Sequence, residues 1–394
     1  METFKDEELI KLAKRTYLVV DHCIGYPINQ VSNIEGFSEW YAKSKLGEMV
    51  TDNVGDPFDE DGYFTVSSMA IEKKVIEMFA PYYGIPLDKI WGFVTNSCTD
   101  SNNHGMYFGC HKLVNETGKM PIVYVSKEAH YSNRRLADLQ NLECRLIEFD
   151  EKGRMDPEDL RKKLDPTRPA LVVIAVGSTF MGSIDNQVAI NKVLEEVKPI
   201  AVYRHVDAAL FGGYLPFTDQ KDIVNMEKMK YDSIAVSGHK FFGIDEPCGL
   251  FLSRKDVYAA QTSYKVDYLN SNMAMINCSR SALHPLKFYW VLTHTGEEVL
   301  KKQAAQCLEN TEYLQSEFDK INYPAWHNEY SNTVFFKRPA DWVVKKYSLA
   351  GGFVPMYGGP LSHIVVMQNV SKRIIDEFIS DLKLSLEGKE NPDL

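Results

Sequence analysis

Short runs of apolar residues recur along the middle of the chain and alternate with segments of helical periodicity. Five runs have the length and β-branched content of buried strands. They are PIVYVS (121–126), CRLIEF (144–149), ALVVIAVG (170–177), IAVYRHVDA (200–208) and SIAVS (233–237). Helical spacing occurs between them, in DPEDLRKKL (156–164) and NQVAINKVLEEV (186–197). This alternation predicts an α/β fold with a mostly parallel central sheet covered by helices on both faces.

The flanking patterns predict two further segments. Charged and apolar residues alternate at helical spacing in residues 1–20, without the long apolar core of a signal peptide or membrane span. Pro, Gly, Asn and Asp are frequent after them, so residues 1–60 are predicted to form an N-terminal helix and arm. Residues 61–286 are then the large α/β domain, which opens with a helix at 67–84.

The C-terminal pattern predicts a smaller α+β lobe over residues 287–394. One long helical stretch at 284–318 precedes two short strands, NTVFFKRP (332–339) and HIVVMQN (363–369), with a helical region between them.

Charge and cysteine usage narrow the class of partner. The formal charge is −10 and no Lys/Arg-rich run occurs, which argues against nucleic acid or an anionic membrane as a partner and favours a small molecule. The 7 cysteines are scattered and form no C-x-x-C pair. An odd number of scattered cysteines favours reduced thiols and a cytoplasmic location.

Polar residues follow four of the predicted strands, where parallel sheets bind ligands. These residues are His130, the pair Ser178 and Thr179, Asp207, and the pair His239 and Lys240, and the small Ala209 follows Asp207 closely. Lys240 directly follows a buried run, and an unpaired buried lysine costs several kcal/mol and has a depressed pKa. Lys240 therefore either reaches solvent or is held for carbonyl chemistry.

An aromatic ring, a carboxylate and a lysine at neighbouring strand ends meet the requirements of pyridoxal phosphate. Lys240 would form a Schiff base with the aldehyde, and Asp207 would keep the pyridine nitrogen protonated. His130 would stack on one ring face, and the small Ala209 would permit close approach on the other. The stretch TNSCTDSNNHG (95–105) supplies hydroxyls and backbone amides at a helix amino terminus, which is an anion site.

Each residue also has a structural interpretation. Lys240 could be solvated, Asp207 a helix cap or turn former, His130 a hydrogen-bonded structural histidine, and the Ser/Thr/Asn run only an N-cap. His205, Asp207 and His239 could form a metal site, although their spacing is not a specific ligand pattern, and we predict no metal. The joint order of the residues favours the cofactor.

Five motifs in one order resemble the group II pyridoxal-phosphate-dependent amino-acid decarboxylases, nearest the short bacterial histidine decarboxylase and plant serine decarboxylase branch. They are TNSCTDSN (95–102), EAHYS (128–132), GSTFMGSID (177–185), HVDAAL (205–210) and SGHK (237–240). The resemblance runs from Ile24 to about Pro285. It implies the fold type I architecture of PLP-dependent transferases and a carboxy-lyase that converts an L-amino acid to an amine and CO2, with histidine the leading substrate. Oxidative deamination, retro-aldol cleavage, or a noncatalytic scaffold with the same fold remain alternatives.

The resemblance also implies residue roles. It assigns the roles given above to Lys240, Asp207, His130 and Ala209. Thr99 would hold the phosphate with the backbone of Ser97 and Cys98, helped by Ser237 and His239. Ser178 or Thr179 would touch the ring hydroxyl or the substrate carboxylate. The family is typically a homodimer with a shared active site. The stretch NCSRSALHP (277–285) is accordingly predicted to bring Arg280 or Ser279 to the neighbouring subunit's phosphate.

Two stretches depart from the branch. A Gly-Gly-Thr-Glu-Gly-Asn loop is usual where this chain has Ser-Cys-Thr-Asp-Ser-Asn (97–102), and Gly-Ser-Arg-Asn-Gly-His where it has Cys-Ser-Arg-Ser-Ala-Leu-His (278–284). Replaced glycines add bulk beside the cofactor or substrate. No tyrosine follows Tyr268 within 268–280, where longer relatives carry a proton-donating loop tyrosine, so the donor stays unassigned.

Overall fold

The structure is a computed structural model that describes residues 6–59, 62 and 64–389. The chain divides into two compact units. One contains residues 32–304, and the other contains residues 1–31 together with 305–394. The predicted three-segment division at residues 60 and 286 stays a prediction. No helix in the described part of the chain is both long and apolar enough to cross a bilayer.

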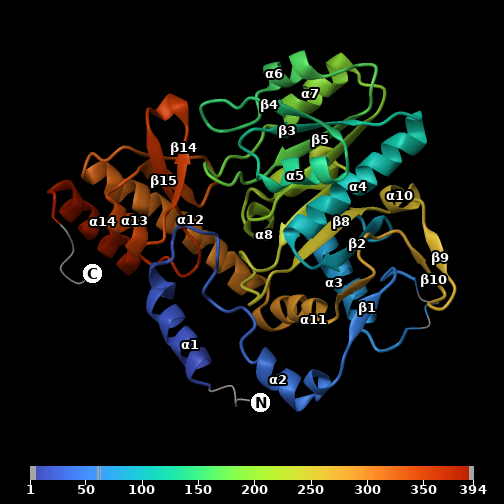
Figure 1. The fold of residues 1–394 in the computed structure, drawn as a ribbon, viewed down its shortest axis with the longest axis horizontal. Helices are drawn as coiled ribbons and strands as arrows, with labels where there is room; N and C mark the ends of the chain where they lie inside the picture. The colour runs from blue at the N-terminus through green and yellow to red at the C-terminus, as the bar shows by residue number, and fades with distance from the viewer. Residues whose placement is uncertain (1–5, 60–61, 63, 390–394) are drawn as a thin grey trace. The chain divides into compact units, whose positions relative to one another are not determined.

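A seven-stranded sheet in the order β2-β8-β7-β6-β5-β3-β4 forms the centre of the larger unit (Figure 1). Strands β7, β6, β5, β3 and β4 are parallel, and β8 pairs antiparallel with both β2 and β7. The strand bounds are β2 (Ile90–Thr95), β3 (Ile122–Ser126), β4 (Glu143–Ile147), β5 (Ala170–Ala175), β6 (Val202–Asp207), β7 (Ser233–Ser237) and β8 (Gly249–Arg254). The predicted α/β architecture with a mostly parallel sheet is confirmed.

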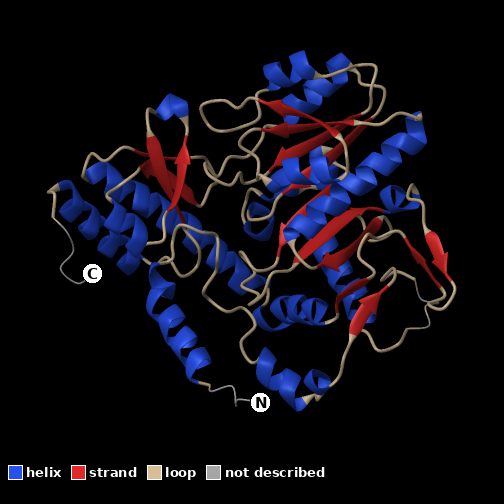
Figure 2. Cartoon of the chain, viewed as in Figure 1, coloured by secondary structure: helices blue, strands red, loops and turns tan. Residues whose placement is uncertain are grey.

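Helices cover both faces of this sheet (Figure 2). The helices that lie wholly within the larger unit are α2 (Phe37–Lys43), α3 (Met69–Phe79), α4 (Cys98–Thr117), α5 (Ser132–Leu139), α6 (Pro157–Lys163), α7 (Gln187–Val197), α8 (Phe211–Tyr214), α9 (Met226–Met229), α10 (Lys255–Ala259) and α11 (Leu283–Trp290). Every residue of β3, β5 and β7 is buried, which explains why these strands read as continuous apolar runs rather than alternating ones.

Two glycines allow α4 to lie directly on β6. A Cβ atom at Gly105 would meet the ring of His205 at 2.2 Å, and one at Gly109 would meet the ring of Tyr203 at 2.5 Å. Because these glycines are four residues apart, they lie on the same face of the helix. This close approach fixes the amino terminus of α4 near the carboxyl ends of the strands.

The smaller unit contains a four-stranded antiparallel sheet in the order β12-β13-β15-β14. Its strands are β12 (Ala325–His327), β13 (Thr333–Lys337), β14 (Ala350–Phe353) and β15 (Pro360–Val365), and its helices are α1 (Glu7–Val19), most of α12 (Glu297–Lys320), α13 (Asp341–Lys346) and α14 (Lys372–Leu386). Phe318, Phe336 and Phe378 meet in its core.

The long helical stretch predicted over 284–318 is interrupted. Helix α11 ends at Trp290, a π-helical turn covers Val291–Thr295, and α12 begins at Glu297. Gly296 between them has a φ of 78°, a left-handed value that glycine adopts without strain. The prediction of one continuous helix was therefore wrong at this glycine.

Two short antiparallel two-stranded sheets complete the larger unit, β1 (Asp52–Val54) with β11 (Ser279–Ser281) and the hairpin of β9 (Tyr264–Val266) with β10 (Ser271–Met273). The first pairing brings Arg280 over α3, where its guanidinium lies 2.9 Å from the carboxylate of Glu72. Both side chains are 0% exposed. Glu72 also accepts hydrogen bonds from Asn53 Nδ2 at 2.7 Å and from the backbone N–H of Val94 at 2.8 Å.

We expect Arg280→Met to lower the free energy of unfolding by about 3–5 kcal/mol, because it leaves a fully buried carboxylate without its cation. Denaturant unfolding of the wild type and the variant measures this. Lys43→Ala is the matched control, because Lys43 and Glu39 form an exposed pair and its loss should cost less than about 1 kcal/mol. Equal small effects in the two variants would contradict a stabilising role for the buried pair.

Candidate active site

The carboxyl ends of neighbouring parallel strands carry most of the predicted site residues. The order β7-β6-β5-β3 places these ends side by side. Asp207 is the last residue of β6, Lys240 lies in the turn after β7, and His130 lies in the loop after β3. Thr179 lies in the turn after β5. The strands thus bring the predicted lysine, acid and histidine to one edge of the sheet.

The charges of Asp207 and Lys240 affect the pKa values of two other residues of the site, Cys98 and His130. Burial and, to a lesser extent, the charge of Asp207 raise the pKa of the Cys98 thiol to about 12, although Lys240 and the hydroxyl of Ser237 partly oppose that rise. Burial lowers the pKa of His130, Asp207 opposes that effect, and Lys240 adds to it. Lys240 therefore acts on Cys98 at the start of α4 and on His130 after β3.

The Lys240 amine lacks a hydrogen-bond or ion-pair partner in the part of the chain that the structure describes. The residue is half-buried, and among the described residues its Nζ makes neither a hydrogen bond nor an ion pair. By contrast, the buried Lys287 binds Asp245 at 2.5 Å and Glu246 at 2.7 Å. A lysine with only a structural role would be expected to form ion pairs like those of Lys287.

The carboxylate of Asp207 is buried and oriented by two donors. Its Oδ2 accepts a hydrogen bond from Asn133 Nδ2 at 2.9 Å, and its Oδ1 lies 3.3 Å from the backbone N–H of Ala209. Asp207 is 6% exposed. The 3.3 Å contact is long for an N–H···O bond, so Oδ1 keeps capacity to accept from a further donor.

His130 is held by the first turn of the following helix. Its Nδ1 lies 2.7 Å from the hydroxyl of Ser132 and 3.3 Å from the backbone N–H of the same residue. Because burial lowers its pKa, the ring is neutral near pH 7. A neutral ring with a fixed Nδ1 can present a flat face to a ligand.

The amino terminus of α4 has unused donors. Ser97 caps the helix by accepting from the backbone N–H of Asp100 at 3.1 Å. Nothing in the described part of the chain accepts from the backbone N–H groups of Cys98 and Thr99, and Thr99 is exposed. The hydroxyl of Ser237 is buried, and its one interaction among the described residues is with the Cys98 thiol, whose pKa it lowers. These free donors at a helix amino terminus fit a phosphate group.

The two residues predicted after β5 differ in their surroundings. Ser178 is buried, and its Oγ lies 2.8 Å from the hydroxyl of Ser183 and 3.0 Å from the backbone N–H of that residue. Thr179 is exposed. The structure therefore turns the Ser178 side chain into its own loop and leaves Thr179 accessible.

His205 cannot serve as a metal ligand in this arrangement. Its Nε2 lies 2.8 Å from Asn102 Oδ1, and its Nδ1 lies 2.8 Å from the hydroxyl of Ser233, so both ring nitrogens are engaged. Burial lowers its pKa to about 4, so the ring is neutral. His239, the other histidine considered for a metal site, lies 3.4 Å from the carbonyl of Cys248, and burial and Lys240 lower its pKa.

Residues 110–327 match the family described as the pyridoxal-dependent decarboxylase conserved domain. Serine decarboxylase 1 of Oryza sativa subsp. japonica is 32% identical over 92% of this chain and 72% of its own length. Histidine decarboxylase of Pseudomonas entomophila is 31% identical over 92% of this chain and 88% of its own length.

The chain belongs to the pyridoxal-dependent decarboxylase family. The fold agrees with this membership. The L-methionine decarboxylase of Streptomyces sp. 590 superposes with a TM-score of 0.80 at 19% identity, covering 98% of this chain and 97% of that chain. The glutamate decarboxylase of Lactobacillus brevis gives a TM-score of 0.79 at 17% identity, covering 98% and 93% of the two chains. The decarboxylase is thus a fold type I enzyme that uses pyridoxal 5'-phosphate, and the free donors described above fit that cofactor.

Arg280 of the decarboxylase does not reach out to a neighbouring subunit. It is 3% exposed and bound to Glu72 and to the carbonyl of Gly55, 3.1 Å away. The prediction that Arg280 approaches another subunit's phosphate was therefore wrong, because a buried carboxylate of its own chain holds it. Ser279, the alternative residue, is exposed.

Glu128 of the decarboxylase was not singled out from the sequence. It precedes His130 in the loop after β3, and its Oε1 accepts from the backbone N–H of Met181 at 2.9 Å and lies 3.4 Å from the Ser178 hydroxyl. It thereby ties the loop of His130 to the turn that carries Thr179. Burial raises the pKa of Glu128 to about 7, and its hydrogen bonds to Met181 and Ser178 only partly offset that rise.

This raised pKa predicts a pH dependence of stability. The folded protein binds a proton at Glu128 that the unfolded chain, with a carboxyl pKa near 4.5, releases earlier. The free energy of unfolding should therefore fall by about 3 kcal/mol as the pH rises from 4.5 through 7. Denaturant unfolding at pH 5, 6, 7 and 8 measures the slope, and Glu128→Gln should remove it between pH 6 and 8.

The buried Asp185, whose pKa burial raises to about 6, contributes a similar fall at lower pH. That part of the slope should remain in the Glu128→Gln variant. A variant with an unchanged slope between pH 6 and 8 would contradict the assignment to Glu128.

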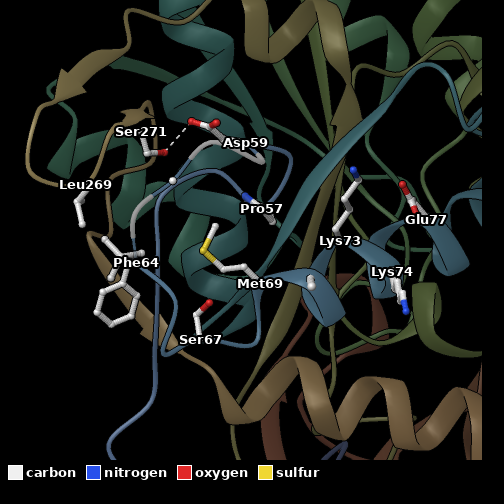
Figure 3. A pocket seen from close by; sticks show the side chains of 13 residues that line it. Pro57, Asp59, Phe64, Ser67, Met69, Lys73, Lys74, Glu77, Leu269 and Ser271 are labelled. Carbon is white, nitrogen blue, oxygen red and sulfur yellow. Dashed lines mark hydrogen bonds between the residues drawn. The ribbon is translucent and has the colours of Figure 1, made fainter.

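A separate pocket lies beside α3 (Figure 3). Its volume is about 560 Å³, and none of the predicted cofactor-binding residues lines it. In Figure 3 the hydroxyl of Ser271 points toward Asp59, 2.9 Å away, and Lys73, Lys74 and Glu77 come from α3. The pocket therefore contributes nothing to the predicted cofactor site.

Proposed function

We propose that Lys240 is the residue that binds the cofactor covalently and that Asp207 and His130 are its partners in decarboxylation of an L-amino acid. The observation that carries this proposal is the half-buried Lys240 amine, which has no hydrogen bond or ion pair in the described chain. Its charge and that of Asp207 both affect the pKa values of His130 and Cys98. An amine in this setting is available to a carbonyl carbon.

The other predicted site residues bind different parts of the cofactor. The backbone N–H groups of Cys98 and Thr99, with the hydroxyls of Thr99 and Ser237, bind the phosphate, and His239 lies beside them. Asp207 would hold a proton at the ring nitrogen, and His130 and Ala209 would contact the two faces of the ring. Thr179 rather than Ser178 faces the ring hydroxyl or the substrate carboxylate, because Ser178 is engaged with Ser183. Pyridoxal phosphate, when bound, supplies a ring that accepts the electron pair left as CO2 departs.

We propose histidine as the substrate, with serine as the second candidate. The support is the pair of similar relatives, a histidine decarboxylase and a serine decarboxylase with nearly equal identity to this chain. Both candidates have a polar side chain that the pocket must satisfy, and a site built to hydrogen-bond such a group rejects analogues that lack it.

A screen of the twenty amino acids with cofactor-loaded protein tests the substrate. We expect CO2 release from histidine, with histamine as the product identified by mass spectrometry. CO2 release from serine with ethanolamine as product would select the second candidate. Ammonia with a carbonyl product would instead indicate oxidative deamination, and an aldehyde with glycine would indicate retro-aldol cleavage.

We further propose that the enzyme is a cytoplasmic homodimer with a shared active site. The free state of all seven cysteines supports a reducing compartment. An unpartnered apolar surface supports association, since Leu9, Leu12 and Leu18 on the amphipathic α1 are 66%, 60% and 78% exposed. Sedimentation equilibrium measures the assembly state, and a fully active monomer would contradict the shared site.

A further inference from the structure

Asn133 is a fully buried polar residue whose only side-chain hydrogen bond in the described chain goes to Asp207. It is 0% exposed, and its Nδ2 donates to Asp207 Oδ2 at 2.9 Å. Its Oδ1 is buried and has no partner among the described residues. A buried acceptor without a partner destabilises the folded protein, and an apolar residue of the same shape would avoid that cost. The contacts therefore give one reason for an asparagine at this position, which is the hydrogen bond that it donates to Asp207.

The contact with Asp207 determines the orientation of the amide. The opposite orientation would place Asn133 Oδ1 against Asp207 Oδ2, so two acceptors would face each other. With Nδ2 facing the carboxylate, the bond is charge-assisted, which makes it stronger than a bond between neutral groups. It occupies Oδ2 and leaves Oδ1, with only the 3.3 Å contact from Ala209, as the oxygen able to accept from a bound ligand.

Asn133 also lies in the turn that holds His130. Its backbone N–H donates to the carbonyl of His130 at 3.0 Å, and the neighbouring Ser132 lies 2.7 Å from His130 Nδ1. The first turn of α5 thus contacts both the carboxylate after β6 and the imidazole after β3. A single rigid element can therefore set the spacing between the two groups.

We infer that Asn133 is a positioning residue, which holds Asp207 Oδ2 so that Oδ1 is presented to the pyridine nitrogen of the cofactor. The inference rests on the role proposed for Asp207. Asn133→Leu keeps the approximate volume and removes the donor. We expect it to lower kcat about ten- to a hundredfold, the effect of one hydrogen bond to a charged group, with little change in KM.

The decisive measurement is the nitrogen-15 chemical shift of the cofactor ring nitrogen, recorded by solid-state NMR with labelled pyridoxal phosphate. The shift reports protonation directly and does not depend on turnover. Wild-type protein should show a protonated nitrogen, and Asp207→Asn should show an unprotonated one. Asn133→Leu should fall between them and should raise the cofactor dissociation constant measured by fluorescence titration. Asn133→Ala is measured in parallel, in case leucine prevents folding.

Asn53→Leu is the matched control. Asn53 is also 0% exposed and donates through Nδ2 to a buried carboxylate, that of Glu72, but it lies outside the predicted site. It should lower thermal stability and leave the nitrogen-15 shift at the wild-type value.

The possible outcomes distinguish a failure of the inference about Asn133 from a failure of the role proposed for Asp207. If Asp207→Asn moves the nitrogen-15 shift and the Asn133 variants, though less stable, keep the wild-type shift, Asn133 is only a brace and the inference is overturned alone. If the wild-type nitrogen is unprotonated, or Asp207→Asn leaves its shift unchanged, the role of Asp207 and the inference both fail.

Discussion

Lys240→Ala is expected to abolish turnover and the covalent attachment of the cofactor while the protein stays folded. The amine it removes has no hydrogen bond or ion pair within the described chain, so its loss breaks no such interaction and should cost little stability. Borohydride reduction followed by proteolysis and mass spectrometry measures the attachment. Wild-type protein should carry the reduced cofactor on the peptide that contains Lys240, and the variant should carry none.

Two further variants distinguish the chemical role of the Lys240 amine from the effect of its positive charge. Lys240→Arg keeps a positive charge at the site but presents a guanidinium, which stays protonated and does not attack a carbonyl carbon, so it should be as inactive as the alanine variant. Lys287→Ala removes a lysine paired with Asp245 and Glu246 and should lower stability without loss of the attachment. A reduced cofactor on any other lysine of the wild-type protein would refute the assignment.

The central strands and the position of Lys240, Asp207 and His130 were predictable because two rules act together. Fully buried parallel strands read as apolar runs, and their carboxyl ends meet at one edge of the sheet. The antiparallel β8 and its neighbour β2 were not predicted as strands. The sequence of β8, GLFLSR, begins with a glycine, and the sequence of β2, IWGFVT, contains Gly92. Gly92 is needed because a Cβ there would meet the carbonyl of Phe251 at 2.3 Å.

Asn133 and Glu72 were missed although each leaves a signal in the sequence. Glu72 shares the helical stripe of Val75, Ile76 and Phe79, at a spacing that places all four on one buried face. In the same way Asn133 shares its stripe with the buried Leu136 and Ala137. A polar residue on an apolar stripe indicates a buried partner, but the partner itself, Arg280 or Asp207, is far away in sequence and only the fold identifies it.

Asp207→Asn is expected to lower kcat about 10²- to 10³-fold with only a modest loss of stability. The replacement has the same shape, and its amide oxygen can still accept from Asn133 Nδ2. It can no longer hold a proton at the ring nitrogen as a carboxylate does, and an unprotonated pyridine is a poor acceptor of the electron pair that CO2 leaves behind. Single-turnover kinetics with the substrate found in the screen measures the effect on the chemical step.

A separation of turnover from binding distinguishes this role from that of a turn former. A structural aspartate at the end of β6 would, when replaced, lower the thermal midpoint and the yield of loaded protein, but each loaded molecule would turn over at the normal rate. Loss of an electronic partner should instead leave loaded protein that binds substrate with nearly the same dissociation constant and reacts slowly. Near-normal kcat per bound cofactor in Asp207→Asn would show that the carboxylate acts through its contacts with Asn133 and Ala209 alone.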